Sequence, residues 1–492
     1  MEEKIKTDVL VIGGAGAGLR AAIEARANGA EVLLVSKLPA AGTSCSLVMA
    51  GWITGVTQEN EDELFKQIVY TGGYINNQHL VDVFLKDAIH RVPELRDFGV
   101  SLEWRGESKD MPGHYITSKI DKNPKGYALL QPMKDKAISM GVRIIDNMPI
   151  SNLMTEGDVV TGAMGFELDT CQLTAISAKS TIIATGGGAY AFERSDNPPG
   201  STGDGFALAY RAGAELIDME FISLNVPRDM VQQVFGVSGE PPESLVNTGT
   251  AHYFLGGIKI DEDGNTSLKG LFAAGEVTGG LLGAARLGGS AVADTIVFGA
   301  RAGKAAAQWA MSNELKDPNP DQINAEKNRF HFSQTFSKVI DDSERWDWEE
   351  IALEDVLADV KSILWRYMGP VKSEYTLNTG LRLLPRVEEQ VSSLLINNPK
   401  EFLAVIEASN IIDLGRIIAT ASLTRKETRG NFWRSDYPQP DNEKWIKNII
   451  ISKEDKDVAI RFSDVVMTRL HHPTEPPIGT GCFWYYPRLD IS

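Results

Sequence analysis

Three glycine-rich stretches hold the residues whose types and spacing could do chemistry. In the first, "VIGGAGAGLRAA", Gly13, Gly16 and Gly18 fall where a chain can turn sharply, present backbone N–H groups to a pyrophosphate and pack a helix closely on a sheet. The spacing departs from a strict G-x-G-x-x-G, because Ala15 stands at the second glycine. A single fingerprint of this kind is weak evidence and needs support from elsewhere in the chain.

Two later stretches give that support. "STIIATGGGAYAF", residues 180–192, and "GLFAAGEVTGG", residues 270–280, are also apolar segments that end in glycines. In the second of these, Glu276 comes one residue past the glycine that ends the strand, where a carboxylate can accept hydrogen bonds from a ribose or ribitol hydroxyl. Three glycine-ended strands around one ligand indicate a dinucleotide rather than a mononucleotide.

Two further side chains have the chemistry to bind a ligand. His252, in "AHYFLGGI", could face a ligand or could be a core histidine at a strand end, and the two glycines that follow favour a ligand. Arg286, in "GAARLGG", could pair with an acidic residue of the chain, but its glycine and alanine neighbours leave little room for such a pair. Contact with a ligand is therefore the favoured interpretation for both.

The elements that must position these residues begin at the N-terminus. An apolar run from Thr7, the Gly/Ala-rich segment after it and "EVLLVSK" read as strand, helix and strand. This βαβ unit predicts an α/β fold with a Rossmann-like domain. Ser36 and Lys37 stand at the end of the second strand, where an acidic residue usually holds a ribose hydroxyl.

The rest of the chain alternates between predicted helices and strands. Amphipathic patterns predict helices over residues 59–72, 77–98 and 126–140, and a small β-meander over 150–177. A helix that packs on the sheet through small residues follows Gly289, and the polar residues 312–328, with two prolines, predict a linker. Three helices of an antiparallel bundle are predicted near residues 350–367, 375–396 and 399–423, with strands and loops after them.

Composition excludes several classes of function. A formal net charge of −17 without any Lys/Arg-rich run disfavours nucleic acid as a partner. The three cysteines, Cys45, Cys171 and Cys482, form no C-x-x-C pair, so no metal site is predicted and a redox metal would have to come from a partner. No signal peptide or membrane-spanning run is apparent, and we expect a cytoplasmic protein, peripheral to a membrane at most through partner subunits.

Eight motifs in a fixed order carry a resemblance to a known family. They are "VLVIGGAGAGLRAA", "IIATGG", "STGDGFALAYRAGA", "MEF", "HYFLGGI", "GLFAAGEV", "GAARLGGSAVADTIVFGARAG" and "TRKETRGNFWRSDYP". From about Thr7 to about Met467 the chain resembles the flavoprotein subunit family of succinate dehydrogenase and fumarate reductase, which includes L-aspartate oxidase and the adenylylsulfate reductase α-subunit.

The resemblance implies FAD as cofactor, hydride exchange between flavin N5 and a small organic acid, and electron exchange with an iron–sulfur or other carrier subunit. It implies a Rossmann-like FAD-binding domain with a β-meander, a remnant of a capping domain and a C-terminal helical domain. The predicted order is a first part of the FAD-binding domain over 1–219, a shortened cap over 220–251, a second part of the FAD-binding domain over 252–325, a helical domain over 326–440 and a tail over 441–492.

The resemblance also assigns candidate site residues. His252 and Arg286 match the histidine and arginine that hold a substrate carboxylate, which suits an imidazole donor and a guanidinium fork. The candidate FAD-binding residues are Gly13, Gly16, Gly18, Ser36, Lys37, Ser44, Cys45, Gly51, Thr185, Gly186, Asp204, Glu276, Ser290 and Ala291. For Asp204 a helix N-cap is an equal alternative, and for residues 424–438 a domain-packing loop is as good an interpretation as a functional one.

The sequence departs from the family in three places. After "MEF", Asn225 stands where a second substrate histidine would be, and residues 220–251 are too short for a full cap and lack its R-G-E-G motif. Arg228, in this segment, is a candidate acid or anion clamp. Cys45 stands where the family's flavin-linked histidine would be, so noncovalent FAD is expected, with a cysteinyl thioether as the alternative.

The shortened cap leaves two hypotheses open. A substrate in an uncapped site would lie in water, which weakens its electrostatic contacts. The first hypothesis is an oxidoreductase subunit that acts on a small organic acid. The second is a flavin-bearing electron-transfer or scaffold subunit of a larger redox complex, with no organic substrate of its own.

Overall fold

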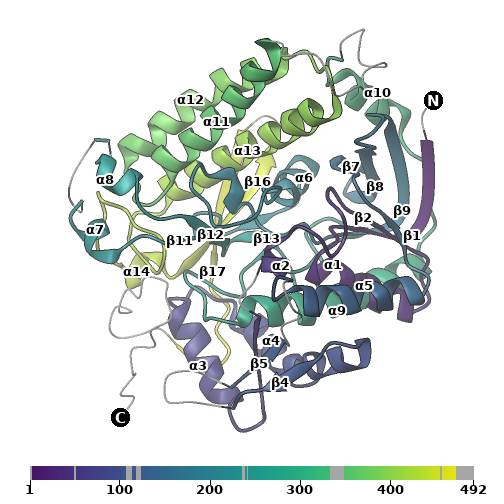
Figure 1. Ribbon diagram of the computed structural model, residues 1–492. Coiled ribbons are helices and arrows are strands. Elements are labelled where there is room, and N and C mark those ends of the chain that lie inside the picture. Colours follow the sequence, from purple (N-terminus) through teal and green to yellow (C-terminus); the bar gives the residue numbers. More distant parts are fainter. Residues whose placement is uncertain are drawn as a thin grey trace.

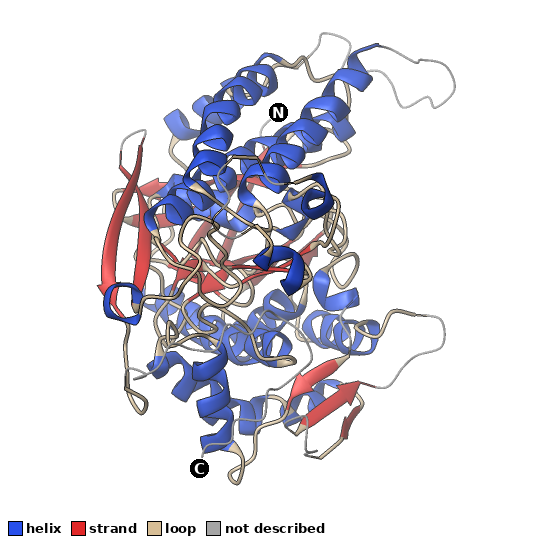
Figure 2. Cartoon of the chain, turned by 90° about the vertical axis from the view of Figure 1, so that its left-hand side faces the viewer, coloured by secondary structure: helices blue, strands red, loops and turns tan. Residues whose placement is uncertain are grey.

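The computed structural model describes residues 3–48, 51–106, 113–117, 123–234, 236, 239–240, 242–332, 348–454 and 457–471. Its elements form a central α/β part, a helical bundle and a smaller three-stranded sheet (Figures 1 and 2). The bundle lies at one end of the molecule and the small sheet at the other.

The central sheet brings the three glycine-ended strands together. β1 and β9 are parallel neighbours, and β14 pairs in parallel with the last residues of β9. Because parallel strands end at one edge, the glycines that follow them converge there, as the sequence predicts. The strands of this sheet are β1 (Glu3–Ile12), β2 (Val32–Val35), β6 (Arg143–Ile145), β7 (Ile150–Glu156), β8 (Val159–Phe166), β9 (Leu173–Ile183) and β14 (Leu271–Ala273).

The predicted β-meander is part of this sheet and not a separate unit. β9 is long enough to pair antiparallel with β8 through its first residues and parallel with β1 along most of its length. The meander β7–β8–β9 therefore continues the central sheet. The predicted segment stopped at Ser177, but the strand runs on to Ile183, directly before the second glycine stretch.

Two helices pack on each other through small residues beside the sheet. They are α1 (Gly16–Ala27) and α9 (Ser290–Ser312). A Cβ added at Gly303 would lie 2.3 Å from the carbonyl oxygen of Ala21, so α9 approaches α1 closely. α9 also contacts β9, where the Ser180 hydroxyl donates to the Ala306 carbonyl, in agreement with the predicted packing of this helix on the sheet. α5 (Tyr127–Ser139) packs against α1, and α4 (Gln78–Arg91) packs against α9.

The predicted helix over residues 77–98 is divided in two. The α-helix α4 ends at Arg91, and a 3₁₀ helix, η1 (Pro93–Phe98), follows it. Pro93 causes the break, because proline lacks the N–H that a continuing α-helix requires. Nearby lie α2 (Cys45–Val48), α3 (Glu61–Thr71) and a sheet of β3 (Trp52–Thr54), β5 (His114–Thr117) and β4 (Leu102–Trp104).

The helical bundle agrees with its prediction. Its helices are α11 (Trp348–Met368), α12 (Glu374–Ser393) and α13 (Pro399–Thr424), which pack on one another. Ser373 caps α12 and Asn398 caps α13 through side-chain hydrogen bonds to backbone N–H groups.

The predicted linker over residues 312–328 is wrong in its second half, which forms the helix α10 (Pro320–Asn328). Asn319 caps this helix by accepting a hydrogen bond from the backbone N–H of Asp321. Pro320 occupies the first helical position, where a missing N–H costs nothing. The proline that signalled a linker in the sequence is therefore a helix start.

The segment that the sequence predicts as a shortened cap packs on the bundle and on the chain that follows it. It contains β11 (Ile222–Leu224), α7 (Arg228–Gln232) and α8 (Glu243–Val246), and it leads into β12 (Ala251–Phe254), which pairs with β11. A small apolar cluster joins it to the C-terminal part: Val231, Val234, Leu245, Val371 and Trp433. The Trp365 indole N–H of α11 also donates to the Val246 carbonyl at 2.7 Å.

Residues 424–438 include several buried side chains that hold the parts of the chain together. Arg425 donates to Glu220 at 2.6 Å and to Glu427 at 2.9 Å, and Arg429 donates to Glu427 and to the Gly73 carbonyl. All these side chains are fully or almost fully buried. The contacts support the interpretation of this motif as a domain-packing loop.

A second sheet lies beside this loop. Its strands are β10 (Leu216–Ile217), β13 (Gly257–Lys259), β15 (Thr278–Gly279), β16 (Lys447–Glu454) and β17 (Asp457–Asp464). The remaining elements are η2 (Ala189–Ala191), α6 (Asp204–Ala212) and α14 (Asn442–Trp445). Among the helices that the structure describes, none combines the length and apolar composition needed to cross a bilayer.

Candidate functional site

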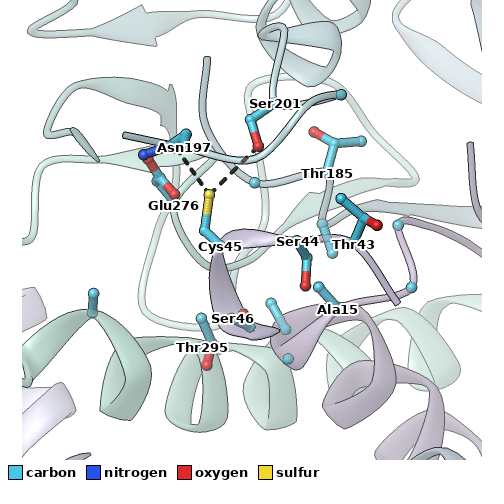
Figure 3. A pocket seen from close by; sticks show the side chains of 18 of the residues that line it. Ala15, Thr43, Ser44, Cys45, Ser46, Thr185, Asn197, Ser201, Glu276 and Thr295 are labelled. Carbon is cyan, nitrogen blue, oxygen red and sulfur yellow. Dashed lines mark hydrogen bonds between the residues drawn. The ribbon is translucent and has the colours of Figure 1, made fainter. Parts of the chain in front are cut away.

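A cavity of about 480 Å³ opens at the edge where the glycine-ended strands converge. Most of the predicted site residues lie around it. Those that line it are Gly13, Gly16, Ser36, Lys37, Ser44, Cys45, Thr185, Gly186, Asp204, His252, Glu276, Arg286 and Ala291. Residues from distant parts of the sequence thus surround one space, and Figure 3 shows some of their side chains.

Three predicted cofactor residues do not line the cavity. Gly18 lies in α1, and a Cβ there would lie 1.9 Å from the Gly13 carbonyl oxygen, so its place in the fold is a close packing contact. Gly51 has φ +78° and precedes β3. Ser290 is the buried first residue of α9, and its hydroxyl has no hydrogen-bond partner within the described residues.

Arg228 is the one candidate catalytic residue without a described side chain. Its backbone begins α7, and its side chain lies outside the residues whose side chains are described. Its predicted role as an acid or anion clamp therefore stays a prediction.

The backbone at the cavity suits an anionic, polar ligand. Gly13 has φ +118°, and a Cβ there would lie 2.2 Å from the Ala184 carbonyl oxygen, so only glycine allows this close crossing. The N-termini of α1 and α9 both line the cavity and have no side-chain cap. Uncapped N–H groups at a helix N-terminus attract phosphate and other anions.

Two buried polar atoms in the cavity wall test whether a polar ligand fits this cavity. The Thr185 hydroxyl oxygen and the Arg286 Nε have no hydrogen-bond partner among the described residues, although both residues line the cavity. Unpaired buried polar groups are costly, and a polar ligand in the cavity could satisfy them. The residues present therefore fit a dinucleotide with a polar ring system.

Lys37 and Asp204 form an ion pair at the cavity. The Lys37 Nζ lies 2.7 Å from an Asp204 oxygen and 2.7 Å from an oxygen of Glu407, which sequence reasoning missed. Burial opposes the charge of Lys37, but these two carboxylates raise its pKa above the usual value. Asp204 is the first residue of α6, while Gly203 is the N-cap residue, so the alternative that Asp204 caps this helix is wrong.

Cys45 is a partly buried thiol within the cavity wall. Its Sγ donates a hydrogen bond to the Asn197 Oδ1 at 2.9 Å and lies 3.5 Å from the Ser201 hydroxyl (Figure 3). Burial, together with the nearby Glu276 carboxyl, raises the pKa of this thiol to about 12. A thiol with this pKa is protonated at neutral pH and is a poor nucleophile. The environment favours noncovalent cofactor binding.

The sequence predicted that the Glu276 carboxyl contacts a ligand, but one of its oxygens is also bound by the protein backbone. Its Oε1 accepts a hydrogen bond from the Phe254 N–H at 3.1 Å, and it packs so closely on Gly187 that a Cβ there would lie 2.1 Å from Oε1. Burial raises the pKa of Glu276 to about 7, and burial with the Glu276 charge raises that of Asp294 to about 7.

His252 and Arg286 are brought together by the fold. His252 lies on β12, and its Nε2 is 3.1 Å from the Arg286 Nη2. The Arg286 guanidinium carbon lies 4.3 Å from the ring centroid of Tyr253, so the arginine also stacks on an aromatic ring. On its other side His252 meets Asp196, with Nδ1 3.0 and 2.9 Å from the two carboxylate oxygens. Sequence reasoning missed Asp196 and Tyr253.

Comparison with known proteins decides the family. The family model for an FAD binding domain matches residues 8–235 and 241–292, and that for the fumarate reductase flavoprotein C-terminal region matches residues 358–477. The chain belongs to the flavoprotein family of fumarate reductase and succinate dehydrogenase. It is an FAD-dependent oxidoreductase with an α/β fold, so the predicted family, fold class and cofactor are confirmed.

Relatives match over nearly their whole length. An uncharacterized FAD-dependent oxidoreductase of Methanocaldococcus jannaschii is 27% identical, covering 91% of this chain and 96% of the relative. A fumarate reductase (CoM/CoB) subunit of Methanothermobacter marburgensis is also 27% identical, covering 92% and 98%. The FrdA chain of E. coli quinol fumarate reductase has the same fold, with a TM-score of 0.80, 20% identity and coverage of 96% and 98%. The predicted domain boundaries stay predictions.

Proposed function

We propose that this flavoprotein transfers a hydride between the N5 atom of bound FAD and a small organic acid. The observation that carries the proposal is the pair of Arg286 and His252, 3.1 Å apart in the wall of the cavity that the FAD-binding elements form. Two relatives named fumarate reductase, from Methanothermobacter and from Mycobacterium tuberculosis, support a small acid as the substrate.

The residues that would hold FAD lie along the cavity. The turn at Gly13 and the N-terminus of α1 would hold the pyrophosphate, and the N-terminus of α9 would face the flavin. Lys37, Asp204 and Thr185 add polar atoms to the cavity wall. Bound FAD supplies the two-electron chemistry that the side chains lack.

Arg286 would bind the substrate carboxylate. A guanidinium presents several N–H donors in one plane, and one of them, at Nε, has no partner among the described residues. Stacking on Tyr253 and the contact with His252 fix this plane before a substrate arrives. An anchor held in advance lowers the entropy cost of orienting the substrate for hydride transfer.

We further propose that electrons pass between the flavin and an iron–sulfur or other carrier subunit. The names of several relatives describe them as subunits, which supports a multi-subunit assembly. No group of three or more metal-ligating side chains occurs in the described part of this chain. The cytoplasmic location expected from the sequence also stays a prediction.

A second candidate follows from the contacts of the short segment that replaces the cap. In its described part, the Val246 carbonyl accepts a hydrogen bond from Trp365 of the bundle, and the cluster around Val231 packs on Val371 and Trp433. A site that this segment does not cover would lose the exclusion of water that strengthens contacts to a charged substrate. This observation favours an electron-transfer subunit whose site is covered by a partner protein.

Flavin absorbance distinguishes the two candidates. Reduced, FAD-loaded protein would be mixed anaerobically with fumarate, and oxidised protein with succinate or L-aspartate. If the protein is an oxidoreductase of this kind, the oxidised flavin band returns with fumarate or disappears with succinate or L-aspartate. The Arg286→Lys variant, with unchanged FAD content, should then lose most of the rate of this spectral change. No spectral change with any of them, in protein that still exchanges electrons with a dye, would support the electron-transfer subunit instead.

A further inference from the structure

Asp196 reaches the site from a loop. This residue lies between η2 and α6, and both of its carboxylate oxygens are within 3.0 Å of His252 Nδ1. His252 in turn contacts Arg286 through its other ring nitrogen. The three side chains form a continuous chain of hydrogen bonds from a carboxylate to the proposed substrate anchor.

The direction of these hydrogen bonds determines where the histidine proton lies. A guanidinium can only donate, so the His252 Nε2 must accept from Arg286. In a neutral imidazole the single proton then sits on Nδ1, facing Asp196. Partial burial opposes ionisation of Asp196, but the hydrogen bond from His252, with those from Asn197 and Thr250, holds its pKa below the usual value.

The other contacts of Asp196 argue against a direct contact with substrate. Its oxygens also accept hydrogen bonds from Asn225 at 2.8 Å, Asn197 at 3.1 Å and Thr250 at 3.4 Å. Together with His252, these donors occupy the lone pairs of the carboxylate. Asn225, which replaces a histidine of the family, thus has a place in this network.

The network also reaches the proposed flavin side of the cavity. The amide nitrogen of Asn197 donates to the His252 carbonyl oxygen at 2.7 Å, and its amide oxygen accepts from Cys45. The backbone and the ring of His252 are therefore held from the same loop. A histidine held at both points cannot rotate without breaking several hydrogen bonds.

We propose that Asp196 is a positioning residue that fixes the Nδ1–H tautomer of His252 and thereby orients Arg286 toward the carboxylate of a substrate. The role as substrate anchor rests on the proposed function. Without the acceptor at Asp196 the proton can move to Nε2, where it points at the guanidinium. The Nε2–H tautomer cannot accept from Arg286, so the arginine loses its partner and its fixed plane.

Nitrogen NMR of the FAD-loaded protein tests the tautomer directly. Histidine would be labelled with ¹⁵N, and the His252 signals would be assigned by their loss in the His252→Gln variant. We expect the Nδ1–H form in the wild type and in Asp196→Asn, whose amide oxygen still accepts, and a shift toward Nε2–H in Asp196→Ala. The exposed Asp158→Ala is the matched control and leaves the tautomer unchanged. An Nε2–H form in the wild type, or no change in Asp196→Ala, overturns the proposal.

Carboxylate binding tests the effect on Arg286 without requiring turnover. Acetate and fumarate would be titrated into oxidised, FAD-loaded protein and followed by the flavin difference spectrum. Asp196→Ala is expected to bind both about tenfold more weakly, the effect of losing one hydrogen bond to a charged group, and Asp196→Asn to recover part of the loss. Unchanged affinity in Asp196→Ala contradicts the proposal.

The two experiments test the positioning role of Asp196 separately from the proposed hydride transfer. If the wild type binds acetate and has the Nδ1–H tautomer but does not turn over any acid, the proposed reaction fails and the positioning role stands. If Asp196→Ala does not load FAD, Asp196→Leu replaces it, because leucine also lacks an acceptor but keeps more of the side-chain volume. Asp196→Leu should then shift the tautomer toward Nε2–H and weaken carboxylate binding, and wild-type values for either would overturn the proposal.

Discussion

At the scale of single residues, environment decides chemistry that residue type leaves open. Cys45 has a nucleophilic atom in the cavity wall, yet burial raises the pKa of its thiol to about 12, and the thiol donates a hydrogen bond to Asn197. His252 is placed between a carboxylate and a guanidinium, which gives its two nitrogens different roles. Residue identity alone predicts neither outcome.

The thiol of Cys45 should form no bond to FAD. On a denaturing gel, the protein band is expected to show no flavin fluorescence, because the thiolate needed for a thioether is scarce at neutral pH. Cys45→Ser, which keeps a hydrogen-bond donor toward Asn197, should bind FAD in the same amount. Fluorescence that stays with the wild-type band and is absent from Cys45→Ser would show the thioether instead.

The buried Glu276 carboxyl predicts a dependence of stability on pH. Its pKa is about 7 in the folded chain, well above that of an exposed glutamate, so folding favours its protonated form. The stabilisation is present at low pH and is lost as pH rises toward and through 7, with a magnitude on the order of 3 kcal/mol or less. Glu276→Gln should remove this part of the pH dependence.

Urea unfolding of FAD-free protein at pH 5 and pH 7.5 measures this effect. The gap in unfolding free energy between Glu276→Gln and the wild type should increase toward pH 7.5, in favour of the variant. Asp294 titrates in the same range, so some pH dependence remains in the variant. If the unfolding free energy had the same pH dependence in the variant and the wild type, the raised pKa of Glu276 would be contradicted.

At the scale of elements, small residues decide how closely the helices approach. α1 and α9 lie so close that Gly303 has no room for a side chain beside Ala21. This contact places the N-termini of both helices at the same cavity. A helix–helix contact remote from the ligand therefore contributes to the shape of the site.

Gly303→Ala should loosen this contact. The added methyl would lie 2.3 Å from the Ala21 carbonyl oxygen, so the helices must separate, at a cost of about 1 to 3 kcal/mol. Thermal unfolding and FAD affinity measure the effect, and both should fall. Ser312→Ala, at the exposed end of the same helix, is the control and should change stability by less than about 0.5 kcal/mol.

At the scale of the whole molecule, buried charges connect the nucleotide-binding part to the helical bundle. Lys37 follows β2, and its partner Glu407 lies on α13, far along the sequence. The cluster around Arg425 and Glu427 makes a second connection. Such ion pairs fix the position of the bundle relative to the sheet more specifically than apolar packing alone would.

Removing Lys37 should destabilise the molecule and weaken FAD binding. Lys37→Met leaves the carboxylates of Asp204 and Glu407 buried without their cation, at a cost of about 3 to 5 kcal/mol. The double variant Lys37→Met/Glu407→Gln should regain part of the melting temperature, since one buried charge is removed. Equal melting temperatures of the single variant and the wild type would show that the pair is not needed.

The glycine stretches and their order determined much about this protein by themselves. Gly13 and the strand ends near Gly186 and Glu276 predicted a dinucleotide site, because the φ angles and close approaches that a phosphate turn needs are properties of glycine itself. The helices of the bundle followed from periodicity, which is local in sequence. Local signals were misleading at Pro93 and Pro320, where one proline divides a predicted helix and the other starts one.

The tertiary structure alone decided the partners of the charged and polar side chains. Asp196 meets His252, and Lys37 meets Glu407, across separations in sequence that carry no spacing signal. The proton positions and pKa values of the site depend on these partners and on burial, and both arise only when distant segments pack together. The sequence therefore determined the family and the cofactor, and the fold determined how each side chain of the site is charged and oriented.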